Sequence, residues 1–411
     1  MTWTEIAHSL AQISQAQPST TEMTAASVAA KNYINKLAET HPNPTIRAEY
    51  VKERDLYEKK LWHQLTLNLE SLVLNPYFDD NKELIELYDN FIREFEARIN
   101  QLKFVKICLG IARQVKDPSQ AIAFIKHFSA KLNQKDKEAY SLILTETAFL
   151  NLRSAQFDTA KQLTEQATTI LDSVTGADPY VYSSLYKTLS AYHKVKVAST
   201  DFYRTSLTYL VYTPIESLSV DEQKVLAFDM GIAALVSPDI YNFGQLLSHP
   251  VLSSLHGTSN EWLAKFLVAF NSGDLYKYDA ILKEYQGKIT ETPALINNMV
   301  LLREKISMLA LMELVFNRTA EERTLTFNTV AEATKVSMEE VELLVMKALS
   351  LDLIRGVIDE PNHTVSIHWV QPRILDLKQV EKMKERVAQW EGNVVSTLRF
   401  VENETAPELL A

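Results

Sequence analysis

The apolar residues in the first third of the chain recur with the period of an α-helix. Between residues 45 and 74 they are separated by three and four positions, which predicts one long amphipathic helix. A second helix is predicted over residues 81–101, and a third around Cys108. The dipeptide Asp117-Pro118 predicts the start of another helix, with the aspartate as N-cap and the proline in the first turn.

The N-terminal segment lacks this apolar pattern. Residues 11–30 are polar and small, and Glu22 is their one charged side chain. Burying so few large apolar groups does not offset the conformational entropy that the segment loses when it becomes ordered. We therefore expect a mobile arm or a loosely docked helix. Residues 1–44 are therefore predicted to form an N-terminal arm and a short helix.

A short pattern of aspartate and apolar residues recurs weakly through the middle of the chain. It begins at Phe157, Phe202, Ile240 and Leu275, at spacings of 45, 38 and 35 residues. An aspartate just before a helix suits an N-cap, and the period is that of stacked helix pairs. Chance matches in any helical protein are the alternative explanation. We predict a helical-hairpin, TPR-like solenoid over residues 45–293.

The pattern changes after residue 293, where short strands join the helices. The order helix, strand, helix, turn, helix and hairpin is that of a winged helix, which we predict over residues 294–371. The predicted elements are a helix over 294–316, a β-like run over 323–327, a helix over 329–334, a helix opened by the S-x-x-E capping box at Ser337, and strands over 353–358 and 364–369. The fold class is thus mainly α, with a helical-repeat solenoid followed by a winged helix and a C-terminal helix.

The last predicted element, within residues 372–411, is a helix with a heptad-like apolar stripe. The stripe residues follow one another at steps of three and four positions, and they are Val380, Met383, Val387, Trp390, Val394 and Leu398. Two interpretations stay open: the helix lies back on its own domain, or it reaches for partner proteins.

The second strand of the predicted wing is a further candidate contact surface. Val365, Ile367 and Trp369 share one of its faces, and its edge offers backbone groups for pairing with a strand of another chain near Ser366. We therefore expect the wing to contact protein, and we count these three residues with the stripe as candidate partner-interface residues.

Composition agrees with a helical, acidic protein. The 411 residues include 9 glycines and carry a net charge of −10, so the residue that most often supplies positive-φ turns is scarce and polyanions are repelled. The single cysteine cannot form an internal disulfide, and no segment resembles a signal peptide or a membrane span. We expect cytoplasmic and nuclear residence and no membrane partner.

The would-be recognition helix of the winged helix is acidic. Glu339, Glu340 and Glu342 stand against Lys347 alone, mostly at the end that usually meets the DNA groove. Phosphate repulsion argues against DNA reading, so no nucleic-acid partner is expected.

Motifs that carry catalysis or hold cofactors are missing from the sequence. It contains neither phosphate-binding glycine loop, nor G-x-S-x-G, nor H-E-x-x-H. The histidine pairs His249 and His256, and His363 and His368, lack the spacing of metal ligands, and Cys108 lies in an apolar setting that raises thiol pKa. We expect no enzyme activity, no catalytic residue, no cofactor and no metal.

Several stretches resemble a known family. They are residues 241–252, 270–275, 341–356 and 368–377, and they resemble the PCI-domain non-ATPase lid subunits of the 26S proteasome regulatory particle. The resemblance covers roughly residues 220–401, whereas the first 140 residues fit by arrangement more than by motif.

The resemblance implies a non-catalytic scaffold subunit of the lid, acting in ubiquitin-dependent protein degradation. It implies that winged helices of PCI subunits join side by side, that the C-terminal helix enters a bundle with those of other lid subunits, and that no zinc is bound. The alternatives are a PCI scaffold subunit of the signalosome or of a translation initiation complex, and an enzyme whose site is built from dispersed residues.

Overall fold

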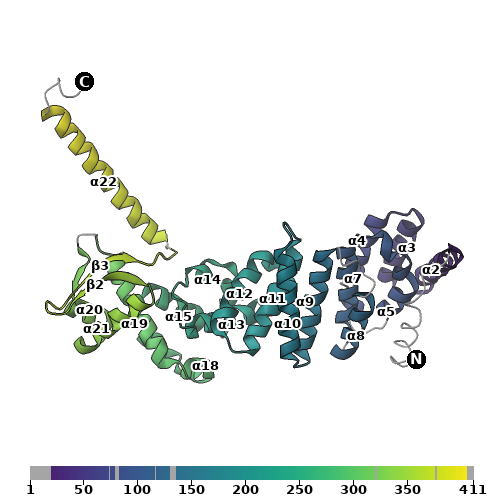
Figure 1. The fold of residues 1–411 in the computed structure, drawn as a ribbon, viewed down its shortest axis with the longest axis horizontal. Helices are drawn as coiled ribbons and strands as arrows, with labels where there is room; N and C mark the ends of the chain where they lie inside the picture. The colour runs from purple at the N-terminus through teal and green to yellow at the C-terminus, as the bar shows by residue number, and fades with distance from the viewer. Residues whose placement is uncertain are drawn as a thin grey trace. The chain divides into compact units, whose positions relative to one another are not determined.

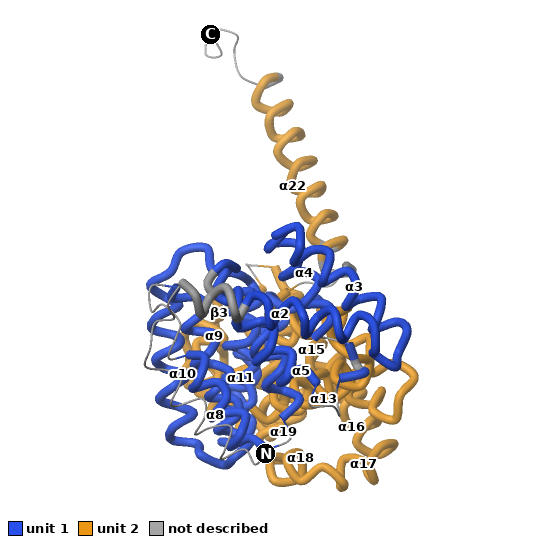
Figure 2. Tube along the Cα trace, turned by 90° about the vertical axis from the view of Figure 1, so that its right-hand side faces the viewer, with its two compact units in different colours: residues 1–214 blue, residues 215–411 orange. Residues whose placement is uncertain are grey.

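The computed structural model describes residues 20–73, 75–78, 83–115, 117–129, 136–319, 322–374 and 377–404. Helices dominate this part of the chain, and a small sheet lies near its C-terminal end (Figure 1). The chain divides into two compact units, Met1–Pro214 and Ile215–Ala411, which Figure 2 colours separately. The division falls inside the region 45–293 that the sequence treats as one piece, so the domain boundaries given above stay predictions.

Unit 1 is built from consecutive helical hairpins. Helix α9 packs against both α10 and α11, and α11 pairs with α12. Its helices are α2 (Thr20–Thr40), α3 (Pro44–Glu58), α4 (Trp62–Val73), η1 (Pro76–Phe78), α5 (Glu83–Leu87), η2 (Tyr88–Ile92), α6 (Arg93–Phe95), η3 (Glu96–Arg98), α7 (Gln101–Arg113), α8 (Pro118–Ser129), α9 (Lys137–Arg153), α10 (Phe157–Asp172), α11 (Pro179–Val195) and α12 (Ser199–Tyr212).

The N-terminal part of the arm prediction, residues 1–19, lies outside the described residues. From Thr20 onward the chain is helical, and Ala30 and Ile34 of α2 are fully buried against unit 1. Within this part the helix is docked by its small apolar residues rather than loosely attached.

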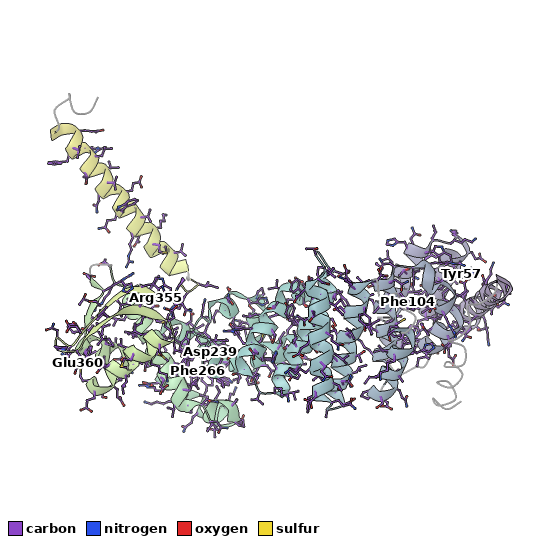
Figure 3. The ribbon with its side chains drawn as sticks, viewed as in Figure 1. Tyr57, Phe104, Asp239, Phe266, Arg355 and Glu360 are labelled. Atoms are coloured by element: carbon purple, nitrogen blue, oxygen red, sulfur yellow. The ribbon has the colours of Figure 1, made fainter. Side chains whose placement is uncertain are left out.

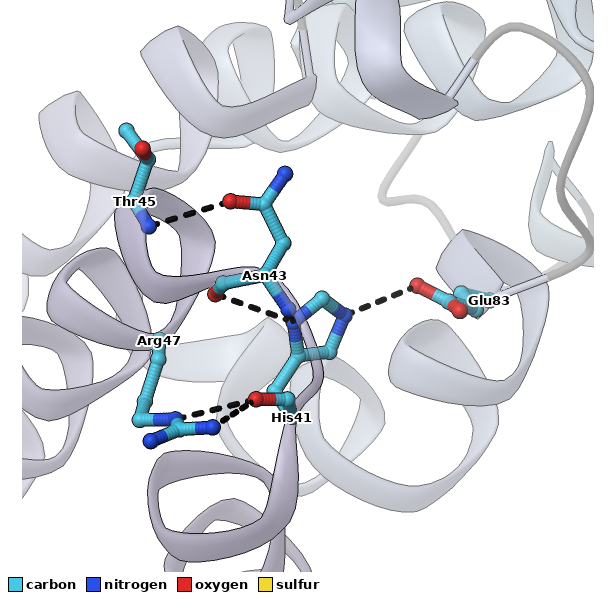
Figure 4. A network of polar contacts seen from close by, with 5 residues as sticks. All are labelled: His41, Asn43, Thr45, Arg47 and Glu83. Carbon is cyan, nitrogen blue, oxygen red and sulfur yellow. Dashed lines mark hydrogen bonds and ion pairs between the residues drawn. The ribbon is translucent and has the colours of Figure 1, made fainter.

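A histidine joins α2 to the helices that follow it (Figure 4). His41 is 4% exposed, and its Nε2 lies 3.4 Å from the carboxylate of Glu83 at the start of α5. Its backbone carbonyl accepts hydrogen bonds from the Arg47 side chain on α3. The Asn43 side chain caps α3 by accepting from the Thr45 N–H at 3.1 Å. These polar contacts fix the turn between α2 and α3.

The single long helix predicted over residues 45–74 is wrong, because the chain breaks it into α3 and α4. Lys60 adopts the left-handed conformation with φ 55°. Its N–H donates to the Tyr57 carbonyl, and the Leu61 N–H donates to the Leu56 carbonyl, both at 3.0 Å. This is the usual hydrogen-bonded end of a helix, formed here without the glycine that normally signals it.

The next predicted helices are confirmed in part. The helix expected over 81–101 is present from Glu83 as α5 but continues through the π-helical turn η2 and the short segments α6 and η3. Helix α8 begins at Pro118, and the Asp117 side chain accepts from the Ser119 N–H at 3.0 Å, as predicted. Cys108 is fully buried on α7.

Two of the four repeat starts coincide with helix starts. Helix α10 begins at Phe157 and α16 at Leu275, where the Asp274 side chain accepts from two backbone N–H groups. Asp201 instead lies within the first turn of α12, and no helix begins at Ile240. The helical hairpins are therefore real, but the aspartate pattern locates only some of them.

Unit 2 combines further helices with a winged helix. Its elements are η4 (Ile215–Ser217), α13 (Val220–Val236), α14 (Gly244–Ser248), η5 (Pro250–Leu255), α15 (Glu261–Ser272), α16 (Leu275–Glu284), α17 (Gln286–Thr290), α18 (Pro293–Ile296), α19 (Met299–Phe316), β1 (Thr324–Thr326), α20 (Phe327–Thr334), α21 (Met338–Ser350), β2 (Ile354–Asp359), β3 (Thr364–Val370) and α22 (Leu377–Glu404). The antiparallel sheet has the order β1-β3-β2, and it packs against α19 and α21. The predicted winged helix is confirmed, with strand limits within about one residue.

A buried lysine ties α19 to the end of α13. Lys305 is 1% exposed, and its ammonium group donates three hydrogen bonds to backbone carbonyls. The acceptors are Ala234, Leu235 and Ser237, at 2.7, 3.2 and 2.7 Å. Burial lowers the pKa of Lys305 to about 7, while the carboxylate of Asp239 acts in the opposite direction. The three donors of the ammonium group thus satisfy carbonyls that the end of a helix leaves without partners.

Candidate protein-interaction surfaces

The C-terminal helix α22 carries the largest set of predicted site residues, and the structure leaves all of them exposed. The six stripe residues, Val380, Met383, Val387, Trp390, Val394 and Leu398, are between 47% and 68% exposed. Every side chain described from Val380 to Glu402 is exposed as well. A contiguous apolar stripe of this length on a free chain is typical of an interaction surface.

Three apolar residues on α22 were missed by the sequence prediction. Val395, Phe400 and Val401 are 40%, 65% and 42% exposed. Val401 continues the stripe by one more step of three residues from Leu398, so the spacing contained the signal. Val395 and Phe400 lie outside this stripe, and both line a hollow on the surface of α22 together with Gly392 and Arg399.

The wing residues on β3 are placed differently from the prediction. Val365 and Ile367 are 1% and 2% exposed, because strand alternation points them into the core of their own winged helix. The expectation that these two residues present an apolar face to a partner is therefore corrected: they stabilise the domain from inside.

Trp369 is half-buried, and a cation covers its ring. The Arg355 guanidinium of β2, labelled in Figure 3, lies 4.4 Å from the ring centroid. Asp352 holds the same guanidinium by hydrogen bonds of 2.8 and 3.0 Å. Trp369 is thus engaged within its own sheet.

The sheet order also corrects the expected pairing edge. Ser366 pairs with Thr324 of β1 on one side and with Val357 of β2 on the other, so β3 is the central strand. In the described sheet the edges belong to β1 and β2. Val357 on β2 is 68% exposed, and it marks the edge that offers an apolar side chain.

The N-terminal end of helix α21 presents negative charge at the surface, as its sequence suggested. Glu339 and Glu340 are exposed in its first turn, and Lys347 forms an ion pair with Glu304 of α19. Ser337 donates to the Glu340 side chain at 2.9 Å but does not cap the backbone, so the capping box is incomplete.

Within the described ranges, no three His, Cys, Asp or Glu side chains are placed to hold a metal ion. The His249 ring accepts from the Val251 N–H at 3.2 Å, so one of the noted histidines has a local structural role. None of the helices described here is both long and apolar enough to cross a membrane.

Two family profiles match the chain, and together they cover most of it. The profile "PSD13 N-terminal repeats" matches residues 49–267, and the "PCI domain" profile matches residues 282–369. The 26S proteasome non-ATPase regulatory subunit 13 of Dictyostelium discoideum is 41% identical over 91% of this chain and 97% of its own length. Homolog B of that subunit from Arabidopsis thaliana is 40% identical over 93% of this chain and 100% of its own length. The chain belongs to the non-ATPase regulatory subunit 13 family.

A translation initiation subunit, one of the alternatives considered above, is also similar to the chain, but less so. The eukaryotic translation initiation factor 3 subunit M of Aspergillus clavatus is 25% identical over 86% of this chain and 74% of its own length. This similarity is weaker than the similarity to the subunit 13 relatives. Within the family, the repeat profile includes α4 to α14, so the repeats continue past the division between the two units.

Proposed function

We propose that this chain is a non-catalytic structural subunit of the lid of the 26S proteasome regulatory particle, where it scaffolds lid assembly for ubiquitin-dependent protein degradation. The observation that carries the proposal is the near full-length similarity to the subunit 13 relatives. The helical repeats, the PCI winged helix and the exposed apolar helix support the same role.

Two surfaces supply the contacts in this proposal. The stripe on α22 packs into a bundle with C-terminal helices of other lid subunits. The winged helix meets other PCI subunits through the edge strand β2, where Val357 is exposed. Trp369 lies on the same sheet and takes part through the part of its ring that stays accessible.

Trp390 is the expected anchor of the α22 contact. An aromatic side chain buries 150–250 Å², and Trp390 is 68% exposed before binding. At roughly 25 cal/mol per Å², covering it contributes about 3 kcal/mol, or roughly a hundredfold in affinity. The neighbouring valines and leucine exclude water around it.

The charge distribution supports protein partners over nucleic acid. The chain carries a net charge of −10, and the lysine of α21 is already paired with Glu304. Phosphate groups therefore find no uncompensated cation on the described helix α21. We place the protein in the cytoplasm and nucleus, without a membrane partner.

Native purification of a tagged full-length chain tests the assignment. We expect mass spectrometry to find proteasome lid subunits and ATPases with the wild-type chain. Trp390→Ala, or truncation after Lys378, removes these partners while the melting temperature of the free chain stays unchanged. Gln389→Ala, an exposed change on the face of α22 opposite the stripe, is the matched control and retains the partners.

Three outcomes contradict the proposal. Recovery of signalosome or initiation-factor subunits without proteasome ATPases assigns the chain to one of those complexes instead. A truncated chain that assembles normally but melts several degrees lower shows that α22 packs on its own domain. Peptidase, isopeptidase or nucleotidase turnover that survives repurification and is abolished by one substitution replaces the scaffold role with an enzyme.

A further inference from the structure

A cavity of about 240 Å³ lies within unit 1, between α7, α8, α9 and α11. Its apolar wall includes Leu109, Ile125, Phe149 and Leu150. Small-molecule sites usually measure 300–1,000 Å³, so this volume suits one bulky side chain better than a cofactor. Helices α7, α8 and α9 follow one another in the chain, and α11 packs directly against α9, so the cavity lies on the repeat scaffold itself.

The one acidic side chain of the cavity is already neutralised. Glu146 is 8% exposed, and it forms an ion pair with Arg113 of α7. The Ser184 hydroxyl donates to the same carboxylate at 3.4 Å, and Arg113 also donates to the Tyr180 hydroxyl at 3.4 Å. Burial by itself lowers the pKa of Arg113, but the Glu146 carboxylate outweighs it and raises that pKa. The ion pair therefore holds the Arg113 side chain of α7 against α9.

Two further cations at the cavity have no such compensation. Arg153 of α9 and Lys187 of α11 are exposed and line the cavity. Neither side chain forms an ion pair or a hydrogen bond with any residue that the structure describes. With Arg113 and Glu146 included, the lining carries a charge of about +2 on a chain whose net charge is −10. Such a local reversal of sign attracts an anionic partner.

We propose that this cavity binds an acidic peptide segment of a partner protein, which inserts one bulky apolar side chain against Phe149 and Leu150 and places its flanking carboxylates on Arg153 and Lys187. The apolar wall selects the inserted side chain, and the two cations select the charge of its neighbours. Arg113 and Glu146 hold α7 against α9 and keep the cavity open. This inference does not rest on the proposed function, and it uses no residue of α22.

Fluorescence anisotropy with two labelled peptides tests the proposal on the full-length chain. The probe is a hexapeptide with Leu–Phe at its centre and two glutamates on each side. Its charge-reversed counterpart carries lysines in place of the glutamates. We expect the acidic peptide to bind and the basic one to bind at least tenfold more weakly.

Variants then locate the binding site. The double variant Arg153→Glu with Lys187→Glu weakens binding of the acidic peptide at least tenfold. Lys161→Glu, a charge reversal on the exposed face of α10, is the matched control and leaves binding within twofold. An acidic peptide with Ala–Ala at its centre binds at least tenfold more weakly than the Leu–Phe peptide.

Four results overturn the proposal. They are no binding of the acidic peptide at millimolar concentration, equal binding of the two charge types, unchanged affinity of the double variant, and equal affinity for the Ala–Ala peptide. The last of these, with displacement by inorganic phosphate, identifies a simple anion site instead. Trp390→Ala leaves peptide binding unchanged, so failure here is distinguishable from failure of the proposed lid assembly.

Discussion

Glu53 on α3 is buried in a setting that favours its protonated form. It is fully buried, and one carboxylate oxygen accepts from the Asn68 side chain of α4 at 2.7 Å. The other oxygen has no hydrogen-bond partner among the described residues. Burial raises the pKa of Glu53 to about 8; the Asn68 hydrogen bond lowers it, and Glu49 raises it further. We predict that Glu53→Gln stabilises the α3–α4 hairpin at alkaline pH.

The direction follows from proton binding in the two states. Between pH 4.5, the ordinary pKa, and about pH 8, the folded chain keeps a proton that the unfolded chain releases. The stability that protonated Glu53 contributes is therefore fully present below pH 4.5, and it is lost as the pH rises from 4.5 to about 8. At about 1.4 kcal/mol per pKa unit, the whole loss approaches roughly 5 kcal/mol, and the step from pH 6 to pH 9 costs about 3 kcal/mol. Glutamine mimics the protonated carboxyl group and avoids this loss.

Hydrogen exchange of peptides from α3 and α4, followed by mass spectrometry at pH 6 and pH 9, measures the local opening free energy. After correction for intrinsic exchange rates, we expect the wild-type value to fall by about 3 kcal/mol and the Glu53→Gln value to fall much less. Asp55→Asn removes an exposed carboxylate from the same helix and serves as the control. Equal pH dependence in the wild type and Glu53→Gln refutes the reasoning, as does an Asp55→Asn variant that behaves like Glu53→Gln.

Two further predictions concern unit 2. Lys305→Met leaves three carbonyl groups without donors, so we expect it to lower the free energy of unfolding at pH 6 by about 3 kcal/mol, measured by urea titration with tryptophan fluorescence. The control Lys277→Met removes an exposed lysine and changes the free energy of unfolding by less than about 0.5 kcal/mol. Equal effects of the two variants contradict the role of the buried ammonium group. Gly356→Ala places a Cβ atom in steric conflict with the Ser366 carbonyl oxygen at the bulge of β2. We therefore expect the free energy of unfolding to fall by about 2 kcal/mol and the melting temperature to fall with it. Gly287→Ala has open space around the new methyl group, and a similar loss there speaks against a steric cause at Gly356.

Local signals in the sequence located many elements correctly. The start of α8 follows from an aspartate and a proline in adjacent positions, and β2 and β3 follow from alternation around a turn. The grouping of apolar residues on one face of α22 follows from spacing alone, because a single helix determines which residues share its face. The exposure of that face did not follow from the spacing. In each case the decisive contacts lie within a few residues of one another.

Features that depend on distant residues were not predictable in this way. Helix α3 ends at Glu58, and Lys60 just beyond it adopts the left-handed conformation. Lysine rarely does so, and the sequence therefore gives no warning of this helix end. Strand β1 has only three residues, and it joins the sheet by pairing with β3. This pairing makes β3 the central strand, so the edge expected at Ser366 lies on β2 instead. The cavity near Arg153 combines residues from four helices, and no spacing in the sequence brings them together.

The contact between Lys305 and the end of α13 limits how the winged helix can be transplanted. A fragment that begins near residue 282, where the PCI profile starts, retains the lysine but loses the carbonyls of Ala234 and Ser237. Its ammonium group then faces apolar surroundings or water in place of a helix end, and α19 loses the neighbour that covers it. Exchanging the winged helix alone between related proteins therefore destabilises it, because the hydrogen bonds of Lys305 and the packing on α19 are lost. A segment that runs from α13 to β3 keeps the Lys305 contact intact.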